Sequence, residues 1–353
     1  MGVDLGSLVV KRPLDWDDVS GKRVAIDAYN TLYQFLATIR QPDGTPLMDD
    51  QGRVTSHLSG LFQRTGHMVE HGIRPVYVFD GAPHELKQAT LAQRRRIKEA
   101  AQAAYEKALE AGDLETARSK AQQTARLLPD MVQESKGLLD ALGVPWIQAP
   151  SEGEAQAAEM VQRGLVDAVA SQDYDSVLFG APLLWRNLSV GGRRKLPGKQ
   201  AWIDVPPEQI ALDETLTELS LTREQVVDLA LLLGTDYNPG VKGIGPKTAV
   251  KLLREEGSLE AVLERSAHEE TGATWAKIRN GREGLEPLEV LRAIFLEPTV
   301  DSVQAPAWGP PEPDAVRRLL VDKHRFSRER IESGLHKYGS GNAQAAQRSL
   351  GEF

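Results

Sequence analysis

The chain has 353 residues, of which 41% are hydrophobic, with a formal net charge of −8 and no cysteine. The missing cysteines exclude disulfides and thiolate metal sites and are typical of a reducing compartment. No apolar run approaches the length of a membrane span and the N-terminus has no signal-peptide layout, so we expect a cytoplasmic protein with no membrane partner. The acidic charge argues against general nucleic-acid binding, but acids gathered at a metal site would lower the total without repelling phosphates.

Two apolar segments in the first part of the chain each end in an aspartate. Residues 22–27 are typical of a short buried strand that stops at Asp27, and residues 74–81 repeat the pattern with Asp80. Helices are expected between them, and strands that alternate with helices predict a mostly parallel sheet flanked by helices. In such sheets ligands bind beyond the carboxyl ends of the strands, which is where both aspartates are placed.

Residues 84–128 have a different composition, rich in Ala, Glu, Lys and Arg and poor in large apolar residues. The Gly-Asp pair at 112–113 is the obvious break and Pro129 the expected stop, so two helices are predicted. Such a hairpin cannot be well buried, and we expect it to project from the domain and to be mobile. Lys87 and Arg94 lie seven residues apart, on one helix face. A solvated helical arm without a catalytic role is the alternative.

The centre of the chain places acids at a helix start and at a strand end. Glu152 and Glu154 stand at the start of an Ala-rich helix, and Asp173 and Asp175 follow a short apolar run. Ser151 with Glu154 also matches a capping box, which by itself would explain Glu154. Taken alone, the segment leaves capping and metal binding open.

Seven acids from separate parts of the chain are candidates for one cluster: Asp27, Asp80, Glu152, Glu154, Asp173, Asp175 and Asp236. Packed together without cations, they would repel strongly. Mg²⁺ resolves this repulsion because it takes oxygen ligands, and the set exceeds what one octahedral ion can use. We therefore expect two Mg²⁺ ions, which Mn²⁺ can replace, in the arrangement that hydrolyses phosphodiesters by activating water and stabilising the leaving oxygen.

The second half of the chain carries basic and glycine-rich segments. Strands at about 183–186 and 200–204 are expected to flank a basic turn that contains Arg194 and Lys195. The run GIGPK at 243–247 opens a helix, and its glycines and proline allow a phosphate to approach the outward-facing N-terminal amides. This suits a DNA backbone bound without sequence preference. An ordinary helix–turn–helix corner is the alternative.

His67 and His71 share one helix face at i and i+4, which could be half of a zinc site. The pattern offers no third ligand nearby, and we predict no zinc site from it. Further along, helices are expected at about 314–320 and 327–337, followed from Gly339 by a small, polar tail typical of disorder.

Five segments resemble the signature blocks of the flap endonucleases, the structure-specific 5′ nucleases of replication and repair. In the order of that family, they are VAIDAYNTLYQFL, PVYVFDG, APSEGEAQAAEM, SQDYDSVLFG and LLLGTDYNPGVKGIGPKTA. The likeness runs over nearly the whole chain and includes FLEP and FSRERIESG towards the C-terminus. Without a long basic C-terminal extension, the chain looks like the archaeal form.

The resemblance implies an α/β fold, a PIN-like, mostly parallel sheet flanked by helices, with a helical arch and a helix-two-turn-helix motif. It implies a nuclease core at 1–235 that includes the arch at about 82–130. The helix-two-turn-helix and C-terminal helices, packed back on the core, would occupy 236–338, and a flexible tail 339–353.

By position, the resemblance makes the seven acids metal ligands, and it makes Lys87 and Arg94 the arch cations that polarise the scissile phosphate. Tyr33 would stack on a base beside the cleavage point, and Thr55 would lie near a pocket for a single 3′-flap nucleotide. The backbone carbonyls of Gly240, Val241 and Ile244 would hold K⁺ against a DNA phosphate. The implied DNA contacts are Gly2, Tyr33, Arg40, Thr55, Arg194, Lys195, Gly243, Gly245 and Lys247.

The last seven residues resemble a sliding-clamp-binding box with Gln347, Leu350 and Phe353 as its anchors. The usual second terminal aromatic is missing, and a polar tail with incidental apolar residues is the alternative.

We therefore expect a monomeric, Mg²⁺-dependent nuclease that binds flapped or nicked duplex DNA. It would cut 5′ flaps at the single-strand/double-strand junction, leaving a 3′-OH and a 5′-phosphate, and act as a 5′–3′ exonuclease in Okazaki fragment maturation and base excision repair. The rivals are a sibling enzyme for bubbles, nicks or four-way junctions, a non-catalytic DNA- and clamp-binding scaffold, and a PIN-type ribonuclease.

Overall fold

The structure is a computed structural model that describes residues 3–188, 192–195, 202–266 and 287–349. Seven strands form one sheet in the order β1-β9-β6-β5-β2-β3-β4. Their bounds are β1 (Arg12–Pro13), β2 (Arg23–Asp27), β3 (Arg74–Phe79), β4 (Trp146–Gln148), β5 (Ala168–Ala170), β6 (Leu183–Arg186) and β9 (Glu208–Ala211). A separate antiparallel pair joins β7 (Gly192–Lys195) to β8 (Trp202–Val205).

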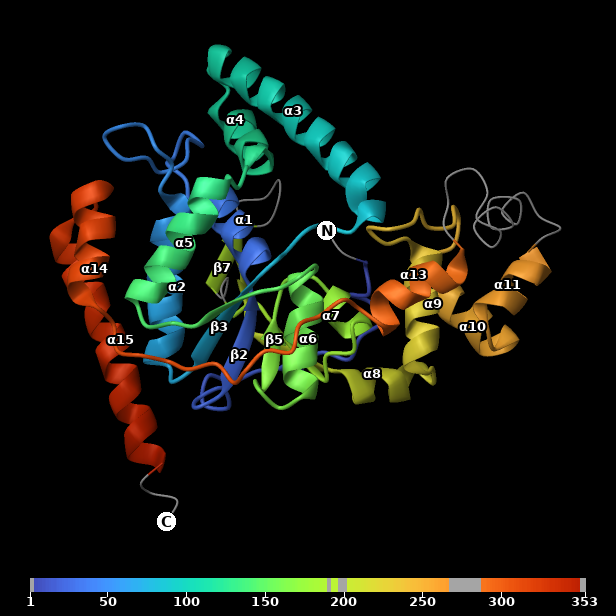
Figure 1. Ribbon diagram of the computed structural model, residues 1–353. Helices are drawn as coiled ribbons and strands as arrows, with labels where there is room; N and C mark the ends of the chain where they lie inside the picture. The colour runs from blue at the N-terminus through green and yellow to red at the C-terminus, as the bar shows by residue number, and fades with distance from the viewer. Residues whose placement is uncertain (1–2, 189–191, 196–201, 267–286, 350–353) are drawn as a thin grey trace.

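The five strands from β2 to β6 run parallel to their neighbours, whereas β9 and β1 are antiparallel at one edge. The predicted mostly parallel sheet is confirmed. Helices cover the sheet on both sides, and α3 with α4 projects away from it (Figure 1).

The helices that precede β6 in the chain are α1 (Ala28–Thr38), α2 (Ser56–Glu70), η1 (Glu85–Lys87), α3 (Gln88–Glu110), α4 (Leu114–Ala121), η2 (Gln122–Thr124), α5 (Pro129–Ala141), α6 (Gly153–Gln162) and α7 (Asp175–Leu178). The helices that follow β6 are α8 (Leu212–Leu219), α9 (Arg223–Leu233), α10 (Pro246–Glu256), α11 (Leu259–Ser266), α13 (Leu288–Leu296), α14 (Pro313–Arg317), the π-helical η3 (Arg318–Lys323) and α15 (Arg328–Ser349). None of the helices in the described ranges combines the length and apolarity needed to cross a membrane.

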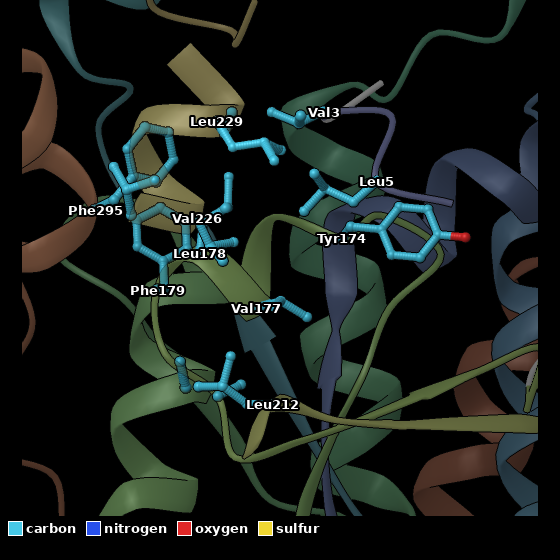
Figure 2. Packing of buried hydrophobic residues seen from close by; sticks show 14 of the residues in the cluster. Val3, Leu5, Tyr174, Val177, Leu178, Phe179, Leu212, Val226, Leu229 and Phe295 are labelled. Carbon is cyan, nitrogen blue, oxygen red and sulfur yellow. The ribbon is translucent and has the colours of Figure 1, made fainter. Parts of the chain in front are cut away.

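Alternate residues of the central strands face two different cores, as the twofold period of a strand requires. In β2, Ala25 packs with the cluster formed by α6, α7, α9 and α13, whereas Val24 and Ile26 pack with the cluster formed by α1, α2, α5 and α15. Figure 2 shows part of the first cluster, in which Val3 and Leu5 of the N-terminal segment lie beside side chains of α7, α9 and α13. Because both faces are buried, the strands lack polar alternation.

The arch formed by α3 and α4 is held by small side chains. The buried residues of α3 are Ala101 and Ala108, and those of α4 are Ala117 and Ala121. The break falls where the sequence predicts it, because Gly112 has a φ of +69° and the side chain of the next residue caps α4. The predicted two-helix, poorly buried hairpin is confirmed.

The structure has helix at two places where the sequence predicts none. Pro129 does not only stop the arch but is the first residue of α5, a position where proline costs no hydrogen bond. At the C-terminal end, α15 continues through Ser349, although we expected a flexible tail from Gly339. The Ala-Gln-Arg run at 343–348 has high helix propensity and outweighs the nearby glycines.

Candidate active site

The acids meet where the strand order reverses. From β2 the chain proceeds to β3 and β4 on one side, while β5 and β6 lie on the other side. Asp27 is the last residue of β2, Asp80 follows β3 directly, and Asp173 lies three residues after β5. Because these parallel strands end at the same edge, their carboxylates converge at the switch point, the place where open α/β sheets bind ligands.

Local hydrogen bonds to backbone amides fix the first two acids. Asp27 is 6% exposed and caps α1, where its side chain accepts a hydrogen bond from the backbone N–H of Asn30 at 3.0 Å. Asp80 Oδ1 accepts from the backbone N–H of Gly153 at 2.7 Å. A Cβ at position 153 would lie 2.7 Å from that oxygen, so only glycine permits the contact. Asp80 is thereby held against the start of α6.

The capping-box interpretation of the α6 start is wrong. Glu152 occupies the N-cap position, and no side chain makes the capping hydrogen bond. Glu154 turns inward instead, because the first turn of α6 faces the other acids. Its Oε1 is buried and has no hydrogen-bond partner among the described residues. An uncompensated carboxylate oxygen in a protein interior is costly, so Glu154 requires an explanation other than helix capping.

Asp173 and Asp175 are oriented by contacts from distant segments. Asp173 Oδ2 accepts a hydrogen bond from Asn30 Nδ2 at 2.9 Å. Asp175 Oδ1 accepts from the backbone N–H of Val3 at 3.0 Å. The side chain of Val3 packs into the core beside Leu5 (Figure 2), which holds the N-terminal backbone against the site.

The arch brings two cations to the acids. Lys87 Nζ lies 2.7 Å from Glu152 Oε2 and 3.4 Å from Asp236 Oδ2. Arg94 Nη2 lies 2.5 Å from Asp236 Oδ1, and the backbone carbonyl of Asp236 accepts a hydrogen bond from Thr90 at 2.8 Å. Because Asp236 follows α9, these contacts connect the start of the arch to the segment after α9. Lys87 and Arg94 therefore both lie against the acid cluster.

Burial and mutual repulsion perturb the ionisation of these groups. Burial raises the pKa of Asp27 well above its usual range, and the nearby Asp80 raises it further. Burial and then Glu152 raise the pKa of Asp80 to about 6, and burial and then Asp173 raise the pKa of Asp175 to about 7. Groups with pKa values shifted in this direction are typical of sites that bind charge.

The donor set fits divalent metal ions that prefer oxygen ligands. Burial raises the pKa of Glu154, with further contributions from Asp175 and Asp27. Lys87 supplies a positive charge at one side of the set. Burial of its ammonium group lowers the pKa of Lys87, but the charge of Glu152 and its hydrogen bond to Lys87 outweigh this effect, so the pKa is above its usual range. Crowded carboxylates with an unpartnered buried oxygen match the ligand chemistry of Mg²⁺ or Mn²⁺, and no sulfur or imidazole donor interrupts the set.

Tyr33, Arg40 and Thr55 lie around the arch and the start of α2 rather than among the acids. Tyr33 is half-buried on α1, and Lys98 Nζ of α3 lies 4.3 Å above its ring. The guanidinium of Arg40 donates to the carbonyls of Leu36 and Gly44, both at 2.9 Å. Thr55 is 4% exposed and precedes α2.

The glycine-rich turn lies between α9 and α10. Gly243 has a φ of +92°, and Gly245 is the N-cap of α10 with Pro246 at its first position. Lys247 is exposed in the first turn. The turn therefore places outward-facing backbone N–H groups at the N-terminus of α10, as the sequence predicts.

The residues whose backbone carbonyls are expected to hold K⁺, which are Gly240, Val241 and Ile244, also lie between α9 and α10. A Cβ on Gly240 would lie 2.2 Å from the Leu233 carbonyl oxygen, so the chain turns back closely on the end of α9. Val241 and Ile244 are joined by an amide-to-carbonyl hydrogen bond of 3.1 Å. A carbonyl oxygen keeps a second lone pair for a cation.

Some predicted contacts fall outside the described residues. Gly2, Leu350 and Phe353 are among these, and so are the side chains of Arg194, Lys195 and Gln347, whose backbones lie in β7 and α15.

Sequence reasoning missed Asn30 and Tyr237, which both contact the acids. Asn30 holds Asp173, and Tyr237 hydrogen-bonds to Glu152 while its ring lies 5.8 Å from Lys87 Nζ. The signal was available in the position of Asn30, because a polar residue three places after a strand-ending aspartate lies on the same helix face. Tyr237 adjoins Asp236 and could have been included on that basis.

Three family models match the chain: the XPG N-terminal domain over residues 5–101, the XPG I-region over 143–236 and the C-terminal SAM fold of 5′-3′ exonucleases over 221–310. The chain is 49% identical to Flap endonuclease 1 of Aeropyrum pernix, over 96% of this chain and 95% of the relative. It is 46% identical to Flap endonuclease 1 of Pyrococcus furiosus, over 96% and 94% of the two chains.

Solved structures give the same result. The flap endonuclease-1 from Methanococcus jannaschii matches with a TM-score of 0.71 and 36% identity, over 97% of this chain and 99% of that chain. The catalytic core of Rad2 in complex with a DNA substrate matches with a TM-score of 0.67 and 26% identity, over 93% and 96%.

Proposed function

This chain belongs to the flap endonuclease family, and we propose that its seven clustered carboxylates hold two divalent metal ions, Mg²⁺ in the cell, at which a DNA strand is cut. The chain is a metal-dependent, structure-specific 5′ flap nuclease, a hydrolase of DNA that also belongs to the exonuclease class.

The observation that carries the proposal is the buried oxygen of Glu154 amid like charges. It lies beside Asp27, Asp173 and Asp175, and it has no partner among the described residues. Without a metal, burial and the neighbouring acids raise the pKa of Glu154 and favour its protonated form, whereas the ionised carboxylate needs a compensating cation. When bound, divalent cations would lower the pKa of a water and stabilise charge on the leaving oxygen. The carboxylates of the chain would hold those ions, with Asn30 fixing the orientation of Asp173.

Lys87 and Arg94 stabilise the scissile phosphate. Both cations lie on the first turns of the arch and now contact Glu152 and Asp236. A phosphate brought to the carboxylate edge would offer them stronger, charge-assisted hydrogen bonds, particularly to the planar guanidinium of Arg94. Because they face the position where negative charge increases during the reaction, they lower the barrier more than they strengthen ground-state binding.

Tyr33 and the neighbouring Lys98 form a stacking platform for a base next to the cleavage point. A tyrosine ring tolerates any base, which suits a nuclease that recognises shape rather than sequence. Arg40 and Thr55 contribute to the duplex on the same side, Thr55 near an unpaired 3′ nucleotide.

The turn before α10 binds the duplex backbone through Gly243, Gly245 and the exposed Lys247. The contact is to phosphate and gives no sequence preference. K⁺ held by the carbonyls of Gly240, Val241 and Ile244 would strengthen it. In the basic strand β7, Arg194 and Lys195 add charge. Gly2 adds a DNA contact next in the chain to Val3, whose backbone N–H donates to Asp175.

The protein acts as a monomer in the cytoplasm, where it cuts DNA during replication and repair. Gln347, Leu350 and Phe353 bind a sliding clamp. A clamp titration in which Leu350→Ala and Phe353→Ala fail to weaken binding would remove this part of the proposal.

The test of function is cleavage of a labelled double-flap DNA with and without Mg²⁺, with the product mapped to the nucleotide. We expect cutting at the single-strand/double-strand junction that requires the metal. Bubble and four-way-junction substrates of the same sequence serve as controls. Preference for either of them over the flap would assign the chain to a sibling activity.

A further inference from the structure

A second cluster of metal-ligating side chains lies at the end of α2, away from the carboxylate site. His67 and Glu70 belong to the last turn of α2, and His71 is its C-cap residue. Strand β3 begins three residues later, at Arg74, so the cluster lies near the start of β3, whereas Asp80 follows the end of that strand. The two sites therefore lie at opposite edges of the sheet.

The three side chains share one helix face because they are spaced at i, i+3 and i+4. One ligand atom from each lies within 4.8 Å of the others, and the imidazole ring centroids are 4.3 Å apart. Among the described residues, these are the histidines and acids that meet this criterion. The i, i+4 histidine pair alone offers two possible ligands, and Glu70 offers a third.

We propose that His67, Glu70 and His71 bind a divalent transition-metal ion such as Zn²⁺, independently of the catalytic metal site. Two imidazole nitrogens and one carboxylate oxygen suit Zn²⁺, Cu²⁺ or Ni²⁺, whereas Mg²⁺ prefers oxygen ligands alone. The site goes beyond the flap nuclease activity and does not depend on it.

The surroundings orient the rings for a metal. His71 Nδ1 lies 2.8 Å from the backbone carbonyl of His67, and as a donor there it leaves Nε2 with its lone pair exposed. This is the usual way in which metal-binding histidines are fixed in one tautomer. Trp16 packs against both rings, with centroid distances of 5.1 Å to His67 and 4.6 Å to His71, and so limits their rotation.

The electrostatic position also favours a cation. The carbonyl end of a helix carries partial negative charge, and the cluster occupies the last turn of α2.

Lys337 of α15 is the group that opposes binding. Its ammonium nitrogen lies 2.9 Å from Glu70 Oε2 and leaves the other carboxylate oxygen for a ligand bond. A bound metal would stand beside this charge and would weaken the ion pair. Removing the lysine charge should therefore strengthen metal binding, a result that a purely structural role of the cluster does not predict.

The experiment is a Zn²⁺ titration of the metal-stripped full chain against a chromophoric chelator, with millimolar Mg²⁺ present to occupy the carboxylate site. We expect one equivalent of Zn²⁺ to bind, and His67→Ala or His71→Ala to lower the affinity by at least about tenfold. Lys337→Met should raise it several-fold. His336→Ala, at an exposed histidine outside the cluster, is the matched control and should change nothing.

Quenching of Trp fluorescence by Cu²⁺ gives an independent signal, because Trp16 touches both ligands. The quenching should disappear in Trp16→Phe and in the double variant of the two histidines. Flap cleavage in Mg²⁺ reports that each variant is folded. Zn²⁺ affinity that is the same in wild type, His71→Ala and Lys337→Met would overturn the proposal, and so would no binding to wild type. If a histidine variant fails to fold, the Lys337→Met result decides.

Discussion

The carboxylate site and the arch are built in opposite ways. Asp27 and Asp80 stand at the ends of buried strands, and backbone N–H groups hold each of them in place. The arch has little apolar packing, because its buried residues are alanines and Ile97 is 54% exposed. The carboxylates are therefore positioned before any ligand arrives, whereas the arch relies on charge contacts to reach the site.

This difference separates two parts of catalysis. A rigid acid cluster suits metal binding, because its geometry must not relax when the charges repel. Weak packing suits an arch that admits a DNA strand, because elements that move are drawn from regions of low local stability.

Replacing an acid should abolish chemistry. Asp175→Ala removes a proposed metal ligand that the Val3 amide orients, and we expect the single-turnover rate to fall at least about a thousandfold, as for an essential catalytic group. DNA affinity should stay within a few-fold in a Ca²⁺ binding assay. Asp17→Ala, at an exposed acid that is not part of the cluster and precedes β2, is the control. Undiminished turnover in Mg²⁺ would contradict the assignment.

An arch variant should affect the rate more than the binding. Arg94→Ala is expected to slow the single-turnover rate by about 10²–10³-fold, because its charge acts on the developing negative charge. Arg95→Ala is the matched control, since Arg95 is its exposed neighbour on α3. Equal losses of rate and affinity for Arg94→Ala would mean that the arch only binds.

A supporting residue of the rigid site should have an intermediate effect. Asn30→Ala leaves all seven acids in place but removes the hydrogen bond to Asp173. We expect a loss of about 10–100-fold, measured as weaker Mg²⁺ dependence of the rate. A normal Mg²⁺ dependence would show that the bond has no role in orienting the acid.

The metal-free site should destabilise the protein as the pH rises. The pKa of Asp80 is raised to about 6 and that of Asp175 to about 7, so between about pH 4 and 7 the folded state binds more protons than the unfolded state. Stability is then lost with increasing pH over this window. The melting temperature in EDTA should fall by a few degrees from pH 5 to pH 8.

Mg²⁺ should reverse this loss, and Asp80→Asn should flatten the pH profile. A melting temperature in EDTA that rises over the same window would be inconsistent with crowded acids.

The arch should exchange its amides faster than the sheet. Hydrogen exchange of α3 and α4 should be rapid without DNA and slower with a flap substrate, while β2 and β3 stay protected in both. Protection of the free arch equal to that of the sheet would remove the contrast between the two regions.

The sequence predicts the positions of Asp27, Asp80 and Asp173 because each ends or follows a strand whose apolar run is easy to see. It also predicts the arch, whose Ala-rich composition and Gly-Asp break are local signals. It did not predict β4 and α5, because Trp146–Gln148 is a three-residue edge strand with exposed positions and little alternation. The antiparallel β9 pairs with β6 through tertiary context, which no local pattern contains.

Within the site, the contacts between distant segments were the ones that sequence reasoning missed. Asn30 meets Asp173 across 143 positions, and Val3 meets Asp175 across 172. The capping box at Ser151 and Glu154, which the segment taken alone left open, has the same origin, because the local motif is present and only the fold shows that it does not form. Local patterns identify which residues can act, and the sheet decides which of them meet.

The account depends on the acids binding divalent ions together, and a Mn²⁺ titration followed by electron paramagnetic resonance tests this most directly. It predicts two Mn²⁺ ions per chain, strong weakening in Asp80→Asn and Asp173→Asn, and no change in the His67→Ala/His71→Ala double variant. Mn²⁺ binding that is unaffected by the two aspartate substitutions would contradict it.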